Sequence, residues 1–262
     1  MQKGVETDEL LGAAIKSLHS PQFDQVFSAW LQACVPFDNI TTLAYFQSQP
    51  PKRLMSESIE PKAHENIDTV YLAGAYLLDP FHDLHIARAP RGVYRLSEIA
   101  PDQFQRNRYF LEYYRNTTMV DEIGFVSYPS DGVSIHVCLG RDSNSGLRFS
   151  NRLIAIAKRM APVVASLAES HWDALNSTGT YTETDFTARL IGAVQQEYDI
   201  SLSPRQAEVA MLILRGHSSV SIGLRLGISA QTVKVFRKQL YRKCDISSQA
   251  ELFNLLLPLL GS

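Results

Sequence analysis

Apolar and polar residues follow two periods along the chain, one typical of helices and one typical of strands. Helical spacing is found at residues 8–18, 23–34, 64–78 and 105–117. Segments rich in β-branched and aromatic residues, which favour strands, are residues 39–47, 122–129 and 133–140. The Ser130-Asp131-Gly132 turn between the last two predicts a hairpin. Together they predict an α+β N-terminal domain, an α/β/α sandwich with an antiparallel sheet.

A polar stretch, NSTGTYTETD at residues 176–185, divides the chain. The helical pattern of residues 149–175 precedes it, with Ser150 placed to cap the helix and Pro162 placed to kink it. A further helix is predicted over residues 185–198. The expected organisation is a first domain at residues 1–175, a linker and connecting helix at residues 176–200, and a second domain at residues 201–262. The arrangement expected for the first domain resembles GAF and PAS domains.

The second domain contains helix signals separated by glycines. Ser203 is placed to cap a helix that Gly216 ends, and a short second helix ends at Gly227. Ser229 then caps a third helix. The second helix offers for burial Val220, Ile222, Leu224 and Leu226. Two helices joined by so short a turn form a helix-turn-helix, and the spacing predicts an all-α four-helix domain.

Charge is distributed unevenly between the two domains. The whole chain has a net charge of −2, with 25 Lys and Arg against 27 Asp and Glu. Residues 201–262 carry +5, because they hold eight basic and three acidic residues. On the third helix, Val233, Phe236 and Leu240 share an apolar stripe that should face the domain core. The polar residues at the helix start and those that lie away from the stripe are candidate DNA contacts: Ser229, Gln231, Thr232, Lys234, Arg237, Lys238 and Arg242.

Residues 202–252 resemble the LuxR-type (GerE-like) DNA-binding domain. The matching residues are Leu202–Arg205, Gly216, Leu226–Ser229, Thr232–Lys234 and Lys243–Ile246. The segment departs from the family pattern at Gln206, Gly223, Phe236 and Gln249. The resemblance implies DNA binding by a homodimer, with the closing helix at residues 247–260 supplying the dimer contact. RNA polymerase is a further candidate partner.

Asp79 ends an apolar segment immediately before Pro80, so its carboxylate is expected to be half-buried. A buried carboxylate needs a partner, which a ligand amine or amide could supply. The alternative is an ordinary turn that ends a helix. The tyrosines at 109, 113 and 114 either line the same pocket or pack in the core, and Ser127 and His136 reach a pocket only if they face inward.

Residues 76–96 resemble the autoinducer-binding domain of LuxR-type quorum sensors. Asp79-Pro80 matches its Asp-Pro pair, and Pro90 and Tyr94 stand where that family has a later proline and an indole. The resemblance implies that the aspartate accepts a hydrogen bond from a ligand amide. Because tyrosine replaces the indole and residues 64–77 contain no tryptophan, the chain is more similar to solo regulators that respond to molecules other than acyl-homoserine lactones. The candidate effector-binding residues are Tyr71, Tyr76, Asp79, Tyr94, Phe110, Tyr114 and Ser127.

Other chemistries have weaker signals. His82, His85 and Asp79 have the spacing of metal ligands on a helix, but we expect a solvent-exposed histidine pair instead. Neither a P-loop nor a GxSxG or HExxH motif is present, so we expect neither an enzyme nor a cofactor. The three cysteines are far apart, and the longest apolar stretch is residues 252–260; both observations favour a cytoplasmic protein without a membrane span.

These patterns favour a transcription regulator in which residues 1–175 sense a small molecule and residues 201–262 bind DNA. Two alternatives remain open. One is a dimeric regulator that needs no ligand. The other is a response regulator controlled by phosphorylation, which is disfavoured because no acidic pair follows an early apolar strand.

Overall fold

The computed structural model describes residues 2–47, 49–177 and 183–260, which belong to two compact units. The first, here called the sheet unit, comprises Met1–His64, Ala87–Glu98 and Thr118–Thr180. The second, here called the helical unit, comprises Glu65–Ile86, Ile99–Thr117 and Tyr181–Ser262. Two segments from the first half of the sequence therefore belong to the same unit as the helix-turn-helix.

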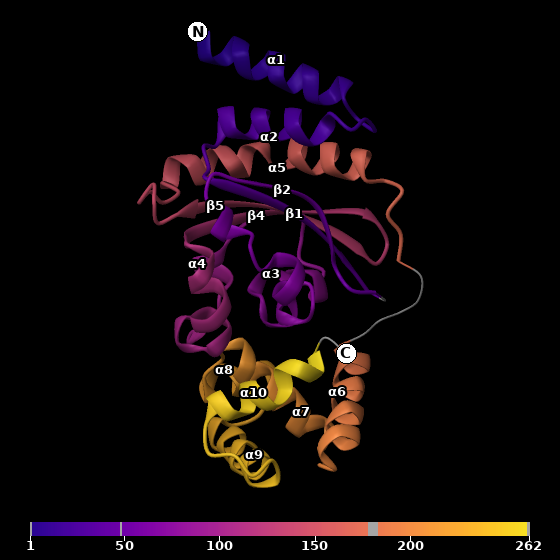
Figure 1. The fold of residues 1–262 in the computed structure, drawn as a ribbon, viewed down its shortest axis with the longest axis vertical. Coiled ribbons are helices and arrows are strands. Elements are labelled where there is room, and N and C mark those ends of the chain that lie inside the picture. The colour runs from indigo at the N-terminus through magenta and orange to yellow at the C-terminus, as the bar shows by residue number, and fades with distance from the viewer. Residues whose placement is uncertain (1, 48, 178–182, 261–262) are drawn as a thin grey trace. The chain divides into compact units, whose positions relative to one another are not determined.

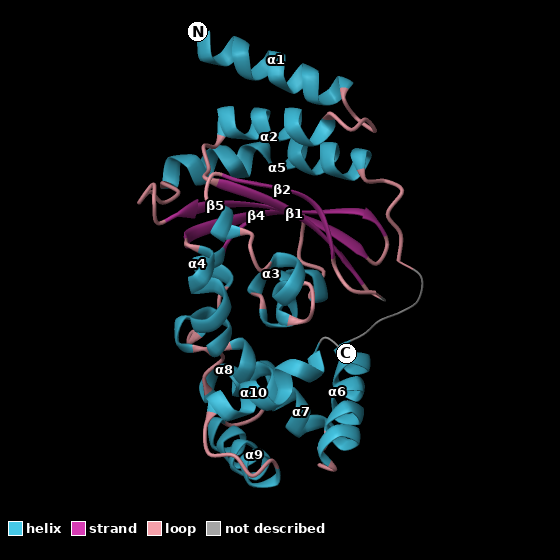
Figure 2. Cartoon of the chain, viewed as in Figure 1, coloured by secondary structure: helices cyan, strands magenta, loops and turns pink. Residues whose placement is uncertain are grey.

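The sheet unit is built on a five-stranded antiparallel sheet in the order β2-β1-β5-β4-β3 (Figure 2). Its strands are β1 (Asn39–Phe46), β2 (Lys52–Ser58), β3 (Gly92–Arg95), β4 (Met119–Ser130) and β5 (Val133–Asp142). The predicted hairpin is confirmed: Ser130 pairs with Val133, and Gly132 turns the chain at a φ of 73°. The sequence pattern missed β2, which is largely polar, and β3, which is only four residues long.

Helices cover one face of this sheet. Figure 1 shows α2 (Phe23–Cys34) and α5 (Asn151–His171) lying on it, with α1 (Gln2–Lys16) packed outside α2. Phe27, Leu31 and Ile135 are fully buried in the core between these layers. The oxygen of Ser150 accepts a hydrogen bond from Leu153 N and caps α5 as predicted, and α5 continues as one helix through Pro162.

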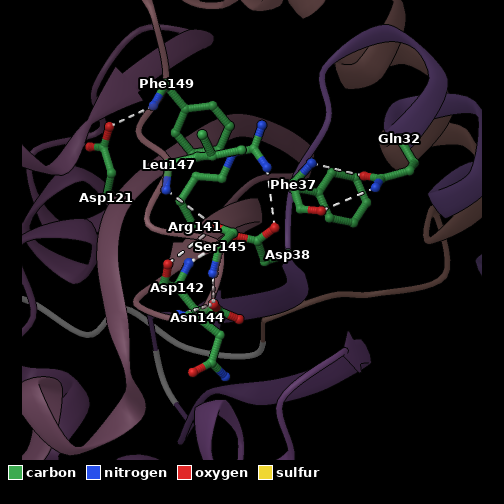
Figure 3. Close-up of polar contacts among 10 residues, drawn as sticks. All are labelled: Gln32, Phe37, Asp38, Asp121, Arg141, Asp142, Asn144, Ser145, Leu147 and Phe149. Carbon is green, nitrogen blue, oxygen red and sulfur yellow. Dashed lines mark hydrogen bonds and ion pairs between the residues drawn. The ribbon is translucent and has the colours of Figure 1, made fainter.

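A buried ion pair joins the chain segments at one end of the sheet. Arg141 Nη1 lies 3.1 Å from Asp38 Oδ1, and its guanidinium lies over the ring of Phe149 (Figure 3). The second Asp38 oxygen accepts hydrogen bonds from Asp142 N at 2.9 Å and Ser145 Oγ at 2.5 Å. This network connects the start of β1 to the loop that leaves β5.

The first-half segments of the helical unit are irregular where long helices were predicted. Residues 64–78 form a π-helical turn, Ile67–Tyr71, and a 3-10 turn, η3 (Ala75–Leu78). Gly74 lies between them with a φ of 148°, a conformation that glycine tolerates and that interrupts a helix. Residues 105–117 form a π-helical turn, Tyr109–Tyr113, between two short 3-10 turns. The predicted helices are therefore wrong in type, although their apolar positions are largely buried.

The helix-turn-helix prediction is confirmed. The helical unit contains α3 (Pro80–Ile86), α6 (Glu183–Tyr198), α7 (Pro204–Arg215), α8 (Ser219–Leu226), α9 (Ala230–Lys243) and α10 (Gln249–Leu260). Ser203 and Gln206 form a capping box at the start of α7, and Gly216 ends it at a φ of 95°. Gly227 and Ser229 likewise separate α8 from α9. The connecting helix α6 packs against α7 and α10.

Burial in α8 differs from the expectation. Ile222 is buried, but Val220 is 63% exposed and Leu224 is 81% exposed. These two residues lie four positions apart on one side of an eight-residue helix, whereas only the Ile222 side of that helix meets the core. In α9, Val233 and Leu240 are buried as predicted, and Phe236 is half-buried.

Candidate DNA-binding and effector sites

Helix α9, the second helix of the helix-turn-helix, presents most of its predicted contact residues to solvent. The side chain of Ser229 accepts a hydrogen bond from Thr232 N at 3.0 Å and fixes the start of the helix. The exposed members of the predicted set are Ser229, Gln231, Thr232, Lys234, Lys238 and Arg242. Because Val233 and Leu240 hold the opposite side in the core, these donors and cations point away from the domain.

Arg237 differs from the other predicted contacts because its guanidinium is held along the helix. It lies 5.1 Å from the ring centre of Tyr241, and its Nε donates to the Tyr241 hydroxyl at 3.2 Å. The neighbouring Lys243 has a structural role, since its Nζ donates to Ser201 O at 2.7 Å and Gln206 Oε1 at 3.0 Å. Lys234, Lys238 and Arg242 are therefore the exposed cations of α9 that take no part in these contacts.

Asp79 directly precedes α3 and is half-buried, as predicted. Its Oδ2 accepts a hydrogen bond from the Tyr71 hydroxyl at 2.6 Å, and its Oδ1 accepts one from Phe81 N at 2.8 Å. Burial raises the pKa of Asp79 to about 6, against hydrogen bonds from Tyr71, Phe81 and Tyr109 that lower it. Burial disfavours the charged form of a carboxylate, and a carboxylate whose pKa is perturbed in this way is typical of a functional site.

The predicted aromatic residues form two groups inside the helical unit. Tyr71 lies beside Tyr76 and Tyr113, with ring centres 6.4 and 5.7 Å apart, and the Tyr71 hydroxyl connects this group to the Asp79 carboxylate. Phe110 and Tyr114 stack on each other at 5.6 Å and pack against another ring, that of Phe104. Sequence reasoning placed Tyr109 only in a general tyrosine cluster and missed its hydrogen bond to Asp79.

The two remaining candidates lie in the sheet unit. Tyr94 is on β3, partly exposed, and its hydroxyl donates to Pro90 O at 2.7 Å. Ser127 is buried on β4, where its hydroxyl lies 3.4 Å from Ile135 O. His136, on β5, is fully buried and contacts Ser134 and the Tyr45 ring. The predicted effector set is thus divided, with five residues in the helical unit and two in the sheet unit.

The expectation of a solvent-exposed histidine pair is wrong. His82 and His85 are both buried, and the His82 ring packs edge-on against Tyr76 at 5.0 Å and lies 6.0 Å from the His85 ring. Among the described residues, no group of histidine, cysteine, aspartate or glutamate side chains is arranged to hold a metal ion.

Comparisons with known proteins agree with this architecture. Residues 200–256 match the family of bacterial regulatory proteins, luxR family. An HTH-type transcriptional regulator in the exeN 3′ region of Aeromonas salmonicida is 31% identical over 185 residues, which are 68% of this chain and 93% of that protein.

One solved structure is similar in fold, and a second is matched more weakly. The LBD domain of VqsR from Pseudomonas aeruginosa is matched with a TM-score of 0.54 at 23% identity, over 64% of this chain and 98% of that chain. SdiA of Escherichia coli is matched over 95% of this chain and 97% of that chain, with a TM-score of 0.39 at 12% identity.

A capped helix-turn-helix with a cationic exposed face defines a DNA-binding transcription regulator. The chain belongs to the HTH-type transcriptional regulators, and its residues 200–256 are a domain of the luxR family of bacterial regulatory proteins. Within the described ranges, none of the helices is both long enough and apolar enough to span a membrane.

Proposed function

We propose that this LuxR-family regulator binds DNA through α9 and a small effector at Asp79, and that effector binding controls DNA binding. The observation that carries the proposal is the half-buried Asp79 carboxylate, which accepts hydrogen bonds from Tyr71 and Tyr109 in the same unit as the helix-turn-helix. The domain that senses the effector is assigned to residues 1–175, the linker and connecting helix to residues 176–200, and the DNA-binding domain to residues 201–262.

The DNA contacts follow from the position of each side chain on α9. Ser229, Gln231 and Thr232 lie at the helix start, which approaches the base edges when such a helix enters the major groove. Lys234, Lys238 and Arg242 continue along the exposed side and are placed to neutralise phosphates. Arg237 is also assigned a phosphate contact. Its guanidinium makes that contact either after leaving the Tyr241 ring or while still stacked on it.

A salt titration of Lys234→Ala tests the DNA-binding part. Removing one phosphate contact should reduce the slope of log affinity against log salt by about 0.9 and leave the melting temperature unchanged. Lys158→Ala, on the exposed side of α5, is the matched control and should change neither quantity. An unchanged slope for Lys234→Ala would remove that residue from the contact surface.

The effector is expected to donate a hydrogen bond to Asp79 and to place an apolar or aromatic group among the tyrosines. An amide, amine or hydroxyl donor could replace the Tyr71 hydroxyl on Oδ2. A thermal-shift screen of small metabolites should find a compound that raises the melting temperature of the chain. The rise should be lost in Asp79→Ala and kept in Asp131→Ala, whose carboxylate is exposed on the hairpin turn.

The active species is proposed to be a cytoplasmic homodimer that uses two recognition helices on two half-sites, with α10 supplying contacts and RNA polymerase as a further partner. The screen also separates this function from its alternatives. A regulator that needs no ligand would show no rise in melting temperature with any metabolite, and a response regulator would be labelled by a small phosphodonor.

A further inference from the structure

Arg215, the last residue of α7, is bound by the chain on both sides of Asp79. Its Nε donates to Leu77 O at 3.0 Å, and its Nη1 lies 3.1 Å from Asp83 Oδ1. The other Asp83 oxygen lies 3.7 Å from Nη1 of Arg225, on α8. The side chain of Arg215 is buried, whereas that of Arg225 is 49% exposed. One carboxylate therefore faces two cations of the helix-turn-helix.

The segment that carries the second aromatic group binds the turn between α7 and α8. Asn107 Nδ2 donates to Arg215 O at 3.0 Å, and Gln103 N donates to Gly216 O at 2.9 Å. Ser218 N, at the start of α8, donates to Asp102 Oδ1 at 3.0 Å. We call Leu77, Asp83, Asp102, Gln103 and Asn107 the α7–α8 clamp.

Gly216 makes this close approach possible. A Cβ at this position would lie 2.8 Å from Asn107 Nδ2 and 3.0 Å from the Cα of Phe104. The clamp also satisfies carbonyl groups at the end of α7 that have no partner within the helix. The clamp therefore depends on a close approach between the backbone near Asn107 and the backbone at Gly216.

The clamp changes the charge that the helix-turn-helix offers to DNA. Asp83 pairs with Arg225, which is otherwise exposed enough to reach a phosphate, and Asp102 adds a negative charge at the start of α8. Burial opposes ionisation of Asp102, but hydrogen bonds from Ser218 and the nearby His217 lower its pKa, so it carries its charge at neutral pH. Both negative charges lie within a Debye length of the groups that they contact, so salt does not fully screen them. They therefore weaken the attraction between the helix-turn-helix and the phosphates of DNA.

The same clamp is connected to the effector site through α3. Asp79 Oδ1 holds Phe81 N in the first turn of that helix, and Asp79 O accepts a hydrogen bond from Asp83 N at 3.3 Å. A ligand that draws the Asp79 side chain out of this arrangement removes the support of the first turn of α3. Asp83 lies one turn further along and would move with it, away from Arg215 and Arg225.

We propose that the α7–α8 clamp is an autoinhibitory contact, in which Asp83 and Asp102 lower the affinity of the helix-turn-helix for DNA until effector binding at Asp79 displaces them. This inference rests on the proposed function, because it assigns the means by which the Asp79 site controls DNA binding.

Asp83→Asn in the full chain tests the clamp, with a fluorescent duplex enriched from a random pool by the wild-type chain as the probe. If the substitution frees Arg225 for one phosphate, affinity should rise about eight-fold at ~0.1 M salt, and the salt slope should steepen by about 0.9. The gain should disappear in an Arg225→Gln background. Glu197→Gln, an exposed residue of α6 in the same unit, makes the same change in net charge and should leave the slope unaltered.

Amide hydrogen exchange in the same variants tests the connection to Asp79. Asp83→Asn should increase exchange at residues 75–86 and at residues 214–219 together, with no change in β4 and β5. If melting shows that Asp83→Asn does not fold, Asp102→Asn, whose side chain is more exposed, should raise the affinity instead.

Three results would overturn the clamp. They are wild-type affinity and slope in a folded Asp83→Asn chain, a gain that persists in the Arg225→Gln background, or increased exchange at residues 214–219 alone. Failure of the wild-type chain and all variants to bind any duplex is a different result, which would refute the proposed function and the clamp with it.

Discussion

Burying the Asp79 charge should reduce the stability of the protein at neutral pH. Its pKa rises from 3.8 to about 6 on folding, chiefly because burial disfavours the charged form. The native state therefore binds more protons than the unfolded chain between about pH 4 and pH 6. The free energy of unfolding contributed by this group falls as the pH rises through that window. A shift of about two pKa units corresponds to a cost on the order of 3 kcal/mol above pH 6.

Asp79→Asn removes this charge but keeps an oxygen that can accept the hydrogen bond of Phe81 N. At pH 7 we expect the variant to be more stable than the wild type by up to about 3 kcal/mol. The difference should shrink to below about 1 kcal/mol by pH 4, where the carboxyl group is protonated in the native state and about half protonated in the unfolded chain. Other groups also titrate in this range, such as His64, whose pKa burial lowers to about 4, but their effect cancels in the comparison.

Urea unfolding followed by circular dichroism at pH 4, 5, 6 and 7 measures this difference. Asp131→Asn is the control, because its carboxylate is 93% exposed and should not change the pH dependence. An Asp79→Asn chain that is less stable than the wild type at pH 7 would show that the carboxylate stabilises the fold. That result would refute the claim that the charge of Asp79 destabilises the folded protein at neutral pH.

Three further substitutions test the packing on which the sites depend. Gly216→Ala should lower the free energy of unfolding by at least about 1–2 kcal/mol, since the φ of 95° is strained for alanine and its Cβ would meet Asn107; thermal melting measures the loss. Ser203→Ala removes the cap of α7 and should cost about 1 kcal/mol in the same assay, with Ser203→Gly costing less. Asp38→Ala leaves Arg141 buried without its partner and should cost about 3–5 kcal/mol in urea unfolding, whereas a loss below ~1 kcal/mol would contradict a buried ion pair.

The helix-turn-helix could be predicted from sequence because its signals are local. Ser203, Gly216 and Ser229 each stop or start a helix through their own backbone geometry or side-chain hydrogen bonds. The hairpin at Gly132 was predictable for the same reason, since a two-residue turn specifies which strands pair. In each case, the residues that determine the structure are adjacent in the sequence.

The effector region could not be predicted in the same way, because its conformation depends on distant partners. The apolar spacing of residues 64–78 fits a helix, but the chain breaks at Gly74 and places Tyr71 on Asp79. His82 and His85 are polar and give no local signal that they are buried. Likewise, the sequence of α7 does not reveal that Arg215 is buried against Asp83.

The long sequence separation within the α7–α8 clamp has a consequence during synthesis on the ribosome. Leu77 O is separated by 138 residues from the Arg215 guanidinium that binds it. At translation rates of about 5–20 residues per second, roughly 7–28 s pass between the synthesis of the two groups. Residues 65–86 and 99–117 thus emerge long before their partner, and their final packing must wait until the last quarter of the chain has been made. A nascent chain stalled before α7 would leave these aromatic segments uncovered and prone to aggregation.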